Sequence, residues 1–143
     1  MKYCTLIVFL FSYLTMAAAL EGPKPEASRH VNLLAAMCEV ESNCDSTKVG
    51  EANEIGMYQI LPAYWQDALE YDPTIGGVYE DVLDKQYAER VIFAFWDRYA
   101  TEKRLGRPVT DEDRARMHNR GPNGYKKDSS IPYWNKVKEL LDG

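Results

Sequence analysis

The chain has 143 residues, of which 45% are hydrophobic and 12% aromatic, and this composition indicates a globular protein rather than a disordered one. It carries 17 Lys and Arg residues against 22 Asp and Glu residues, which gives a net charge of −5. The acidic balance argues against nucleic acid or an anionic membrane as the main partner, because both attract basic proteins.

The first residues have the layout of a secretory signal peptide. Lys2 is followed by an apolar run over residues 6–14 and by three alanines at 17–19 that suit a cleavage site. The run is too short for a spanning helix, so a membrane anchor is the weaker alternative. We expect a signal peptide at residues 1–19 and one secreted domain at residues 20–143, with no membrane anchoring of the mature form. Loss of Lys2 changes the net charge from −5 to −6.

The mature chain is expected to keep two cysteines, Cys38 and Cys44, because Cys4 leaves with the signal peptide. Two cysteines in an oxidising compartment predict a disulfide. The closed loop is short, so the bridge removes little entropy and is expected mainly to fix the end of a helix. Two free thiols, or a metal site completed by His30 and His118, are less favoured, and no metal or other cofactor is expected.

The first half of the expected domain begins with a helix. Ser28 suits the N-cap of a helix over about residues 29–40, which has an apolar stripe along one face. The next three residues are expected to end this helix. A polar loop follows from residue 45 and is expected to finish in a short strand or hairpin at residues 57–60.

The middle of the chain predicts two helices separated by a turn. Pro62 suits the first turn of a helix that ends near residue 70. A long helix over about residues 82–105 carries two apolar rows, which indicate a buried central helix. Gly106 and Pro108 are expected to end it.

The last third predicts two shorter helices around a loop rich in glycine and proline. Thr110 and Asp113 form a capping-box pattern that starts a helix through about Met117. A loop at residues 119–123 follows, and Ser130 is expected to cap a helix over residues 131–141. The expected fold class is therefore α+β and mostly α, with one small β element.

Glu41 is the first candidate for a catalytic residue. It follows an apolar helix and lies between the two cysteines, where the polar loop begins. A carboxyl group in apolar surroundings can stay protonated near neutral pH, as the general acid of a glycoside hydrolase must. A glutamate at a helix end is more often an exposed surface residue, so the position alone does not decide its role.

Five stretches of the sequence together resemble the invertebrate-type (i-type) lysozymes, in the family's order. They are residues 37–44 (MCEVESNC), residues 56–60 and 64–67 (GMYQI and YWQD), residues 115–124 (ARMHNRGPNG) and residues 133–137 (YWNKV). The resemblance covers most of residues 31–138 and marks a divergent, cysteine-poor member. It implies a lysozyme-like fold with a cleft beside the β element, and hydrolysis of β-1,4 bonds in peptidoglycan or a chitin-type polysaccharide.

The resemblance also implies roles for individual residues. Glu41 matches the general acid of the family, and the two cysteines match a family pair. Tyr58 and Gln59 look like floor residues of the sugar cleft. His118 and Asn119 match a family loop that faces the cleft, so all four are expected to bind substrate.

The second catalytic carboxylate is less defined. In the family it is an aspartate in the loop after the glutamate helix, and here Glu51 lies nearest the expected place, with Asp45 and Glu54 as rivals. The alternative is that all three are solvated loop acids. Carboxyl groups about 5–5.5 Å apart would predict retention of configuration, and about 6.5–9.5 Å inversion.

Arg120 departs from the family, which usually has glycine at this position. A side chain there costs stability if the backbone requires a positive φ. Its guanidinium could contact an anionic sugar or a peptide carboxylate, or it could block the cleft.

Two other functions remain open from the sequence. The Glu-Ser, Gly-x-x-Gln-Ile and His-Asn pattern also resembles goose-type lysozymes and lytic transglycosylases, in which a single glutamate does most of the work. A non-catalytic lysozyme-like protein that binds peptidoglycan or chitin is the second alternative, and the acidic charge and Arg120 favour it somewhat. No feature of the sequence indicates an oligomeric state.

Overall fold

The computed structural model describes residues 25–143, with side chains described from residue 30 onward. The expected signal peptide lies outside these residues. The helices of the described chain are α1 (Pro25–Ser42), α2 (Pro62–Tyr71), α3 (Lys85–Tyr99), α4 (Glu102–Leu105), α5 (Asp111–Arg120) and α6 (Ile131–Asp142). Short 3-10 helices occupy Pro73–Ile75, Tyr79–Leu83, Gly124–Lys126 and Asp128–Ser130. None of the described helices is long and apolar enough to cross a membrane.

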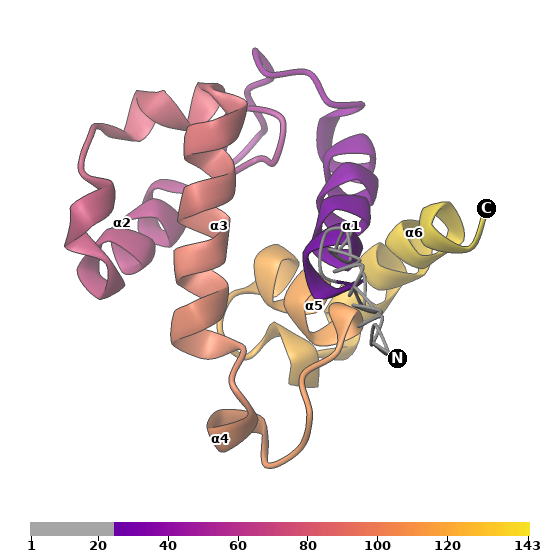
Figure 1. The fold of residues 1–143 in the computed structure, drawn as a ribbon. Coiled ribbons are helices and arrows are strands. Elements are labelled where there is room, and N and C mark those ends of the chain that lie inside the picture. The colour runs from indigo at the N-terminus through magenta and orange to yellow at the C-terminus, as the bar shows by residue number, and fades with distance from the viewer. Residues whose placement is uncertain (1–24) are drawn as a thin grey trace, which may run out of the picture.

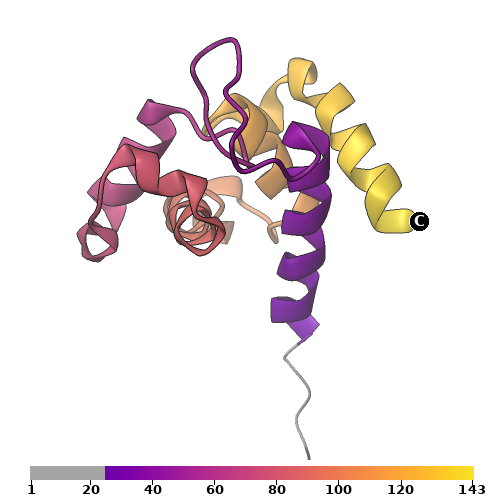
Figure 2. The ribbon, with the colours of Figure 1, turned by 90° about the horizontal axis from the view of Figure 1, so that it is seen from above.

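The helices pack in two groups around one core (Figure 1). α2 packs against α3, and α1 packs against α6, while α5 contacts α1, α3 and α6 and so joins the groups. Figure 2 shows the loop that follows α1 crossing toward α2. The largest fully buried side chains include Leu33, Met37, Tyr58, Ile60, Ile92, Phe95 and Met117.

α1 is longer than the sequence predicts, at both ends. It begins at Pro25, whose ring suits the first turn of a helix, so Ser28 lies inside the helix and is not its N-cap. At the other end Glu41 belongs to the last turn. The helix stops where Asn43 and Cys44 adopt positive φ angles of 53° and 57°.

The predicted disulfide between Cys38 and Cys44 is confirmed, with the two Cα atoms 4.8 Å apart. It joins the last turn of α1 to the first residues of the loop. The Ser42 hydroxyl donates to the Met57 carbonyl at 2.8 Å and accepts from the Asp45 amide at 3.0 Å. These bonds attach the end of α1 to both ends of the following loop.

The single helix predicted over residues 82–105 is wrong, because side-chain caps divide this segment. The Asp84 carboxylate accepts from the Tyr87 amide at 2.9 Å and starts α3 there. The Thr101 hydroxyl accepts from the Arg104 amide at 3.3 Å and starts the short α4. The two apolar rows fall mainly on α3, which is buried as expected.

The capping box of α5 is confirmed, since the Thr110 hydroxyl accepts from the Asp113 amide and the Asp113 carboxylate accepts from the Thr110 amide. α5 continues through Arg120, beyond the predicted end, and stops at Gly121 with φ 77°. Ser130 occupies the N-cap position of α6, as predicted, but its hydroxyl does not cap the helix. The hydroxyl instead donates to the Gly124 carbonyl at 2.7 Å.

The expected β element does not form a strand among the described residues. Isolated bridges pair Ile55 with residues 49 and 60, and no ladder continues from them. Positive φ angles at Asn53, Gly56 and Gln59 reverse the chain between the bridges. The fold is therefore mostly α, and the segment beside Glu41 is a bridged loop.

Both the backbone conformation of Gly56 and the space around it disfavour a side chain at this position. Its φ is +79°, and an added Cβ would lie 2.8 Å from the Val82 carbonyl oxygen. Gly106 has a similar φ of +71° with nothing within 4 Å, so Gly106→Ala is a matched control for backbone strain alone. We expect Gly106→Ala to cost about 1–2 kcal/mol in unfolding free energy.

Gly56→Ala should cost at least about 1 kcal/mol more than its control, because the Val82 carbonyl must also move. Urea unfolding of both variants measures this difference. Equal losses would show that the contact with Val82 does not constrain the loop.

Candidate active site

Three helix ends and one loop surround a cavity of about 190 Å³, here called the Glu41 cavity. The last turn of α1, the first turn of α2 and the last turn of α5 each contribute to it. Its lining residues are Glu41, Ala52, Glu54, Gln59, Leu61, Tyr64, His118, Asn119 and Arg120. Two of the four substrate-contacting groups expected from the sequence thus come from α5 and not from a loop.

Glu41 has the surroundings that a general acid needs. Its side chain is 17% exposed, and burial raises its pKa from 4.5 to about 7. Glu54 raises the pKa further, whereas Tyr133, Lys48 and Arg120 lower it. Burial is the largest of these effects, so the carboxyl group is substantially protonated at neutral pH.

Tyr133 of α6 and Lys48 of the loop both lower the pKa of Glu41. The Tyr133 hydroxyl is buried and makes no hydrogen bond of standard geometry, yet it lies close enough to the Glu41 carboxyl to act on it. The Lys48 amine donates to the main-chain carbonyl of Glu41 at 2.7 Å. The two effects together are smaller than that of burial, so the pKa stays near 7.

His118 is buried and neutral. Its Nε2 lies 2.9 Å from the Tyr58 carbonyl, which can only accept, so the proton is on Nε2 and Nδ1 accepts from the Tyr64 hydroxyl at 3.3 Å. Burial lowers its pKa to about 4. Although Nε2 is 3.7 Å from a Glu41 oxygen, a neutral ring makes no ion pair there. His118 is therefore a fixed polar wall of the cavity.

A second cavity of about 340 Å³ adjoins the first. Both are lined by Leu61, Tyr64, His118, Asn119 and Arg120, and the second also includes Asp67, Phe95 and Pro122. The two cavities together form one groove, which runs from Glu41 past the end of α5 to α2. A linear polymer could therefore extend beyond the Glu41 carboxyl.

Gln59 and Asn119 both line the Glu41 cavity. The Gln59 amide nitrogen donates to the Gly56 carbonyl at 2.8 Å, which fixes the side chain over the loop. The Asn119 side-chain oxygen is buried and has no hydrogen-bond partner. It is therefore available to accept a hydrogen bond from a ligand.

Two of the expected site residues lie elsewhere. Glu51 is exposed and does not line the groove. Tyr58 is 1% exposed, and its hydroxyl donates to Glu89 at 2.8 Å beside α3, so its ring does not form the cleft floor. Only its main-chain carbonyl reaches the site, through His118. The resemblance implies that Tyr58 and Gln59 share the cleft, whereas the tight turn at Gly56 and Gln59 separates their side chains.

The rival loop carboxylates also separate. Glu54 lines the Glu41 cavity, and its carboxylate accepts from the Ala52 amide at 2.9 Å. Asp45 is exposed and accepts from both the amide and the hydroxyl of Thr47, which lowers its pKa. Glu54 is the one loop acid of the three that shares a cavity with Glu41.

Arg120 lies in the last turn of α5, and no positive φ is required of it, because the positive φ falls on Gly121. It is exposed and lines both cavities of the groove. The backbone strain considered from the sequence is thus absent at Arg120.

Sequence reasoning missed the parts played by Tyr64, Tyr133 and Lys48. Tyr64 stacks on Phe95 with ring centroids 3.8 Å apart, while its hydroxyl meets His118 and its side chain lines both cavities. Both tyrosines belong to the stretches that resemble the family, and this could have marked them as site residues. Aromatic residues in such stretches usually pack in the core, whereas these two both pack in the core and contact the site.

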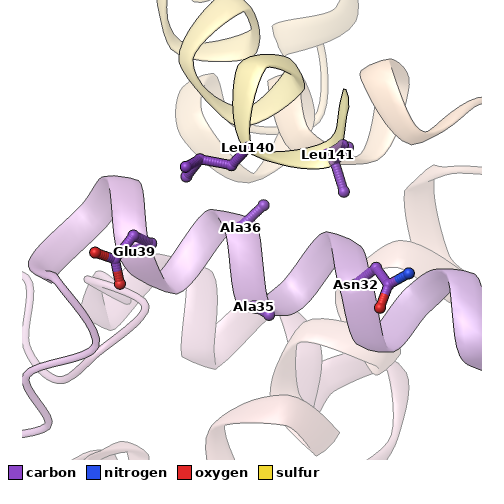
Figure 3. A pocket seen from close by; sticks show the side chains of 6 residues that line it. All are labelled: Asn32, Ala35, Ala36, Glu39, Leu140 and Leu141. Carbon is purple, nitrogen blue, oxygen red and sulfur yellow. The ribbon is translucent and has the colours of Figure 1, made fainter. Parts of the chain in front are cut away.

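A cavity of about 360 Å³ between α1 and α6 lies apart from Glu41 (Figure 3). Its walls are formed by Asn32, Ala35, Ala36, Glu39, Leu140 and Leu141. Glu39 is the single ionisable residue of this lining, so the cavity has no second acidic or basic side chain to act with it.

Burial of Glu41 and His118 makes stability depend on pH in opposite directions. Folded Glu41, with a pKa of about 7 against 4.5, contributes stability that is fully present below pH 4.5 and lost as the pH rises through 7. Folded His118, with a pKa of about 4 against 6.5, loses stability as the pH falls from 6.5 toward 4. Each effect is at most about 3 kcal/mol.

Urea unfolding of the wild type, Glu41→Gln and His118→Gln at pH 4.5 and pH 7.5 separates the two effects. As the pH is raised from 4.5 to 7.5, the unfolding free energy of the wild type should decrease relative to that of Glu41→Gln. Over the same change it should increase relative to that of His118→Gln. Differences that do not change with pH would contradict the burial of these groups.

Comparisons with known proteins agree with the fold. Residues 30–140 match the family model described as Destabilase. The chain is 33% identical to a lysozyme of Meretrix lusoria, over 75% of this chain and 86% of that protein. It is 30% identical to invertebrate-type lysozyme 6 of Caenorhabditis elegans, over 75% of this chain and 83% of that protein.

Solved structures give the same result. The Meretrix lusoria lysozyme, solved in complex with PliI of Aeromonas hydrophila, superposes with a TM-score of 0.65 at 31% identity, and 76% of this chain and 87% of that chain are covered. The Tapes japonica lysozyme superposes with a TM-score of 0.64 at 25% identity and the same coverage. The chain belongs to the Destabilase family and is an invertebrate-type lysozyme.

Proposed function

We propose that Glu41 is the general acid with which this lysozyme hydrolyses β-1,4 glycosidic bonds of peptidoglycan. The family membership makes the chain a glycoside hydrolase of the lysozyme type. The observation that supports the role of Glu41 is its pKa of about 7 at the wall of a groove. A carboxyl group that stays protonated at neutral pH and can still be reached by a polymer can donate a proton to a leaving oxygen.

The reaction requires two proton transfers. Glu41 gives its proton to the glycosidic oxygen, the bond from that oxygen to the anomeric carbon breaks, and the oxygen leaves with the electron pair. The sugar that remains has oxocarbenium character. One water molecule finally supplies the new hydroxyl group, and its second proton restores the acid.

Glu54 is the carboxylate that we assign to the developing positive charge. It lines the same cavity as Glu41 and interacts with it electrostatically. A negative charge near the anomeric carbon stabilises the transition state, and it also favours the protonated form of Glu41. This assignment replaces Glu51, whose exposed side chain lies outside the groove lining.

The polar walls suit an N-acetylated amino sugar. The Asn119 oxygen can accept from the N–H of an acetamido group, and Gln59 lies across the same cavity. His118 holds the last turn of α5 to the loop through the Tyr58 carbonyl, which keeps Asn119 at the groove. The substrate is therefore a β-1,4 polymer of such sugars, and peptidoglycan is the one we assign.

Neither alternative from the sequence is favoured, because the relatives and solved structures that the chain matches are lysozymes. We also propose that the protein is secreted and acts outside the cell. The disulfide at the end of α1 supports this, because such bridges persist in oxidising compartments.

Substitution of the two carboxylates tests the assignment. Glu41→Gln should lower the rate of cell-wall clearing by roughly 10²–10⁴-fold, because the proton donor is lost. Glu54→Gln should lower it by roughly 10²-fold, because the cationic transition state loses its partner. Glu51→Gln removes the same charge three residues away and should leave the rate unchanged. Parental rates in Glu41→Gln would refute the proposal.

The pH dependence of the rate gives a second test. Because the active form of Glu41 is protonated, kcat should fall above pH 7 by about tenfold per pH unit. Measurement of clearing between pH 5 and pH 9 at constant ionic strength reveals this limb. A rate that stays constant up to pH 9 would contradict a general acid with a pKa of about 7.

A further inference from the structure

Arg120 differs from most of the described arginines, and Arg90, the other one whose guanidinium makes no hydrogen bond, lies outside the groove lining. The guanidinium groups of five described arginines donate hydrogen bonds to named partners: Arg98, Arg104, Arg107, Arg114 and Arg116. No hydrogen bond or ion pair of the Arg120 side chain occurs within the described residues. A guanidinium offers five N–H donors in a planar fork that matches a carboxylate, so Arg120 has full capacity to bind one.

The position of Arg120 directs this capacity to a ligand in the groove. It lines both cavities and stands where they adjoin. It also lies close enough to Glu41 to lower the pKa of that carboxyl. The Lys127 amine donates to the Arg120 carbonyl at 2.9 Å, which adds a second cation at this end of α5.

The charge of the rest of the protein makes a local cation more significant. The chain has a net charge of −5, and the groove lining includes the acids Glu54 and Asp67. An anionic polymer is therefore repelled by the protein as a whole. A free guanidinium at the groove attracts a substrate carboxylate that lies next to it, and this local attraction offsets the overall repulsion.

We propose that Arg120 is a specificity-determining residue that binds a carboxylate of the substrate, so that the groove distinguishes anionic peptidoglycan from neutral chitin. This inference rests on the proposed function, since it assigns the substrate class of the same site. Peptidoglycan offers two sources of the carboxylate: the lactyl ether of its muramic acid and the stem peptide. Chitin has neither.

Binding to a catalytically silenced protein tests the inference without turnover. In the Glu41→Gln background the Glu41 charge is absent, so Arg120 can no longer change its pKa. Any effect of Arg120→Gln on binding then comes from the lost contact with the ligand. Two ligands carry carboxylates: peptidoglycan tetrasaccharides with stem peptides, and the same saccharides with the peptide removed and the lactyl carboxylate free. Two ligands lack them: the stem-peptide fragments with amidated carboxyls, and chitotetraose. Exposed Arg90 on α3, outside the groove lining, provides Arg90→Gln as a control of equal charge.

We expect Arg120→Gln to raise the calorimetric Kd for a carboxylate-bearing fragment by about tenfold, as loss of a charged hydrogen-bonded pair predicts. Arg120→Lys should recover part of this loss. Binding of the amidated fragments and of chitotetraose should not change, and Arg90→Gln should bind every ligand as its parent does. A loss on the free lactyl fragment identifies the lactyl source, and a loss only with stem peptides identifies the peptide.

Three results would overturn the inference: an equal loss on every ligand, no loss on any, or no binding of carboxylate fragments by the Glu41→Gln parent. The proposed function fails by a different result, which is the absence of cell-wall turnover by the wild type. The two failures are therefore distinguishable, because one is measured by binding and the other by hydrolysis.

Discussion

Burial of one carboxyl group at the end of α1 is the constraint on which the rest of the site depends. Glu41 is mostly enclosed, and the loss of hydration raises its pKa to about 7. A fully buried carboxyl would be inaccessible to a polymer, and an exposed one would be ionised. The last turn of a helix, where the chain must leave the core, provides the intermediate degree of burial.

Several local interactions hold that last turn in place. The Cys38–Cys44 disulfide joins it to the loop, and the Ser42 hydroxyl donates to the Met57 carbonyl. His118 then attaches the end of α5 to the same loop through the Tyr58 carbonyl. The ends of α1 and α5 are thereby fixed relative to each other, which places Glu41 of α1 in one cavity with the polar side chains of α5. Precise placement of this kind contributes much of the rate that an enzyme gains.

The electrostatics of the groove combine two requirements that act in opposite directions. A transition state with positive character favours nearby carboxylates, which is the role proposed for Glu54, and Glu54 also raises the pKa of Glu41. An anionic substrate favours cations, which is the role proposed for Arg120 at the junction of the two cavities. Separation of the two charges along one groove lets the reacting sugar and its carboxylate substituents meet different surroundings.

The sequence alone predicts most of the helices and the disulfide, and it singles out Glu41 as a candidate general acid, because these depend on local spacing, capping residues and motifs. The capping box at Thr110 is an example, since it involves residues three apart. Which loop acid shares a cavity with Glu41 was decided only by the tertiary structure. Glu51 and Glu54 differ by three positions in a segment with several positive φ angles, and their directions follow from how the loop closes on α2 and α5. Burial of Glu41 likewise depends on groups from α2, α5 and α6 that are distant in sequence, and desolvation is a property of that assembled environment rather than of the local chain.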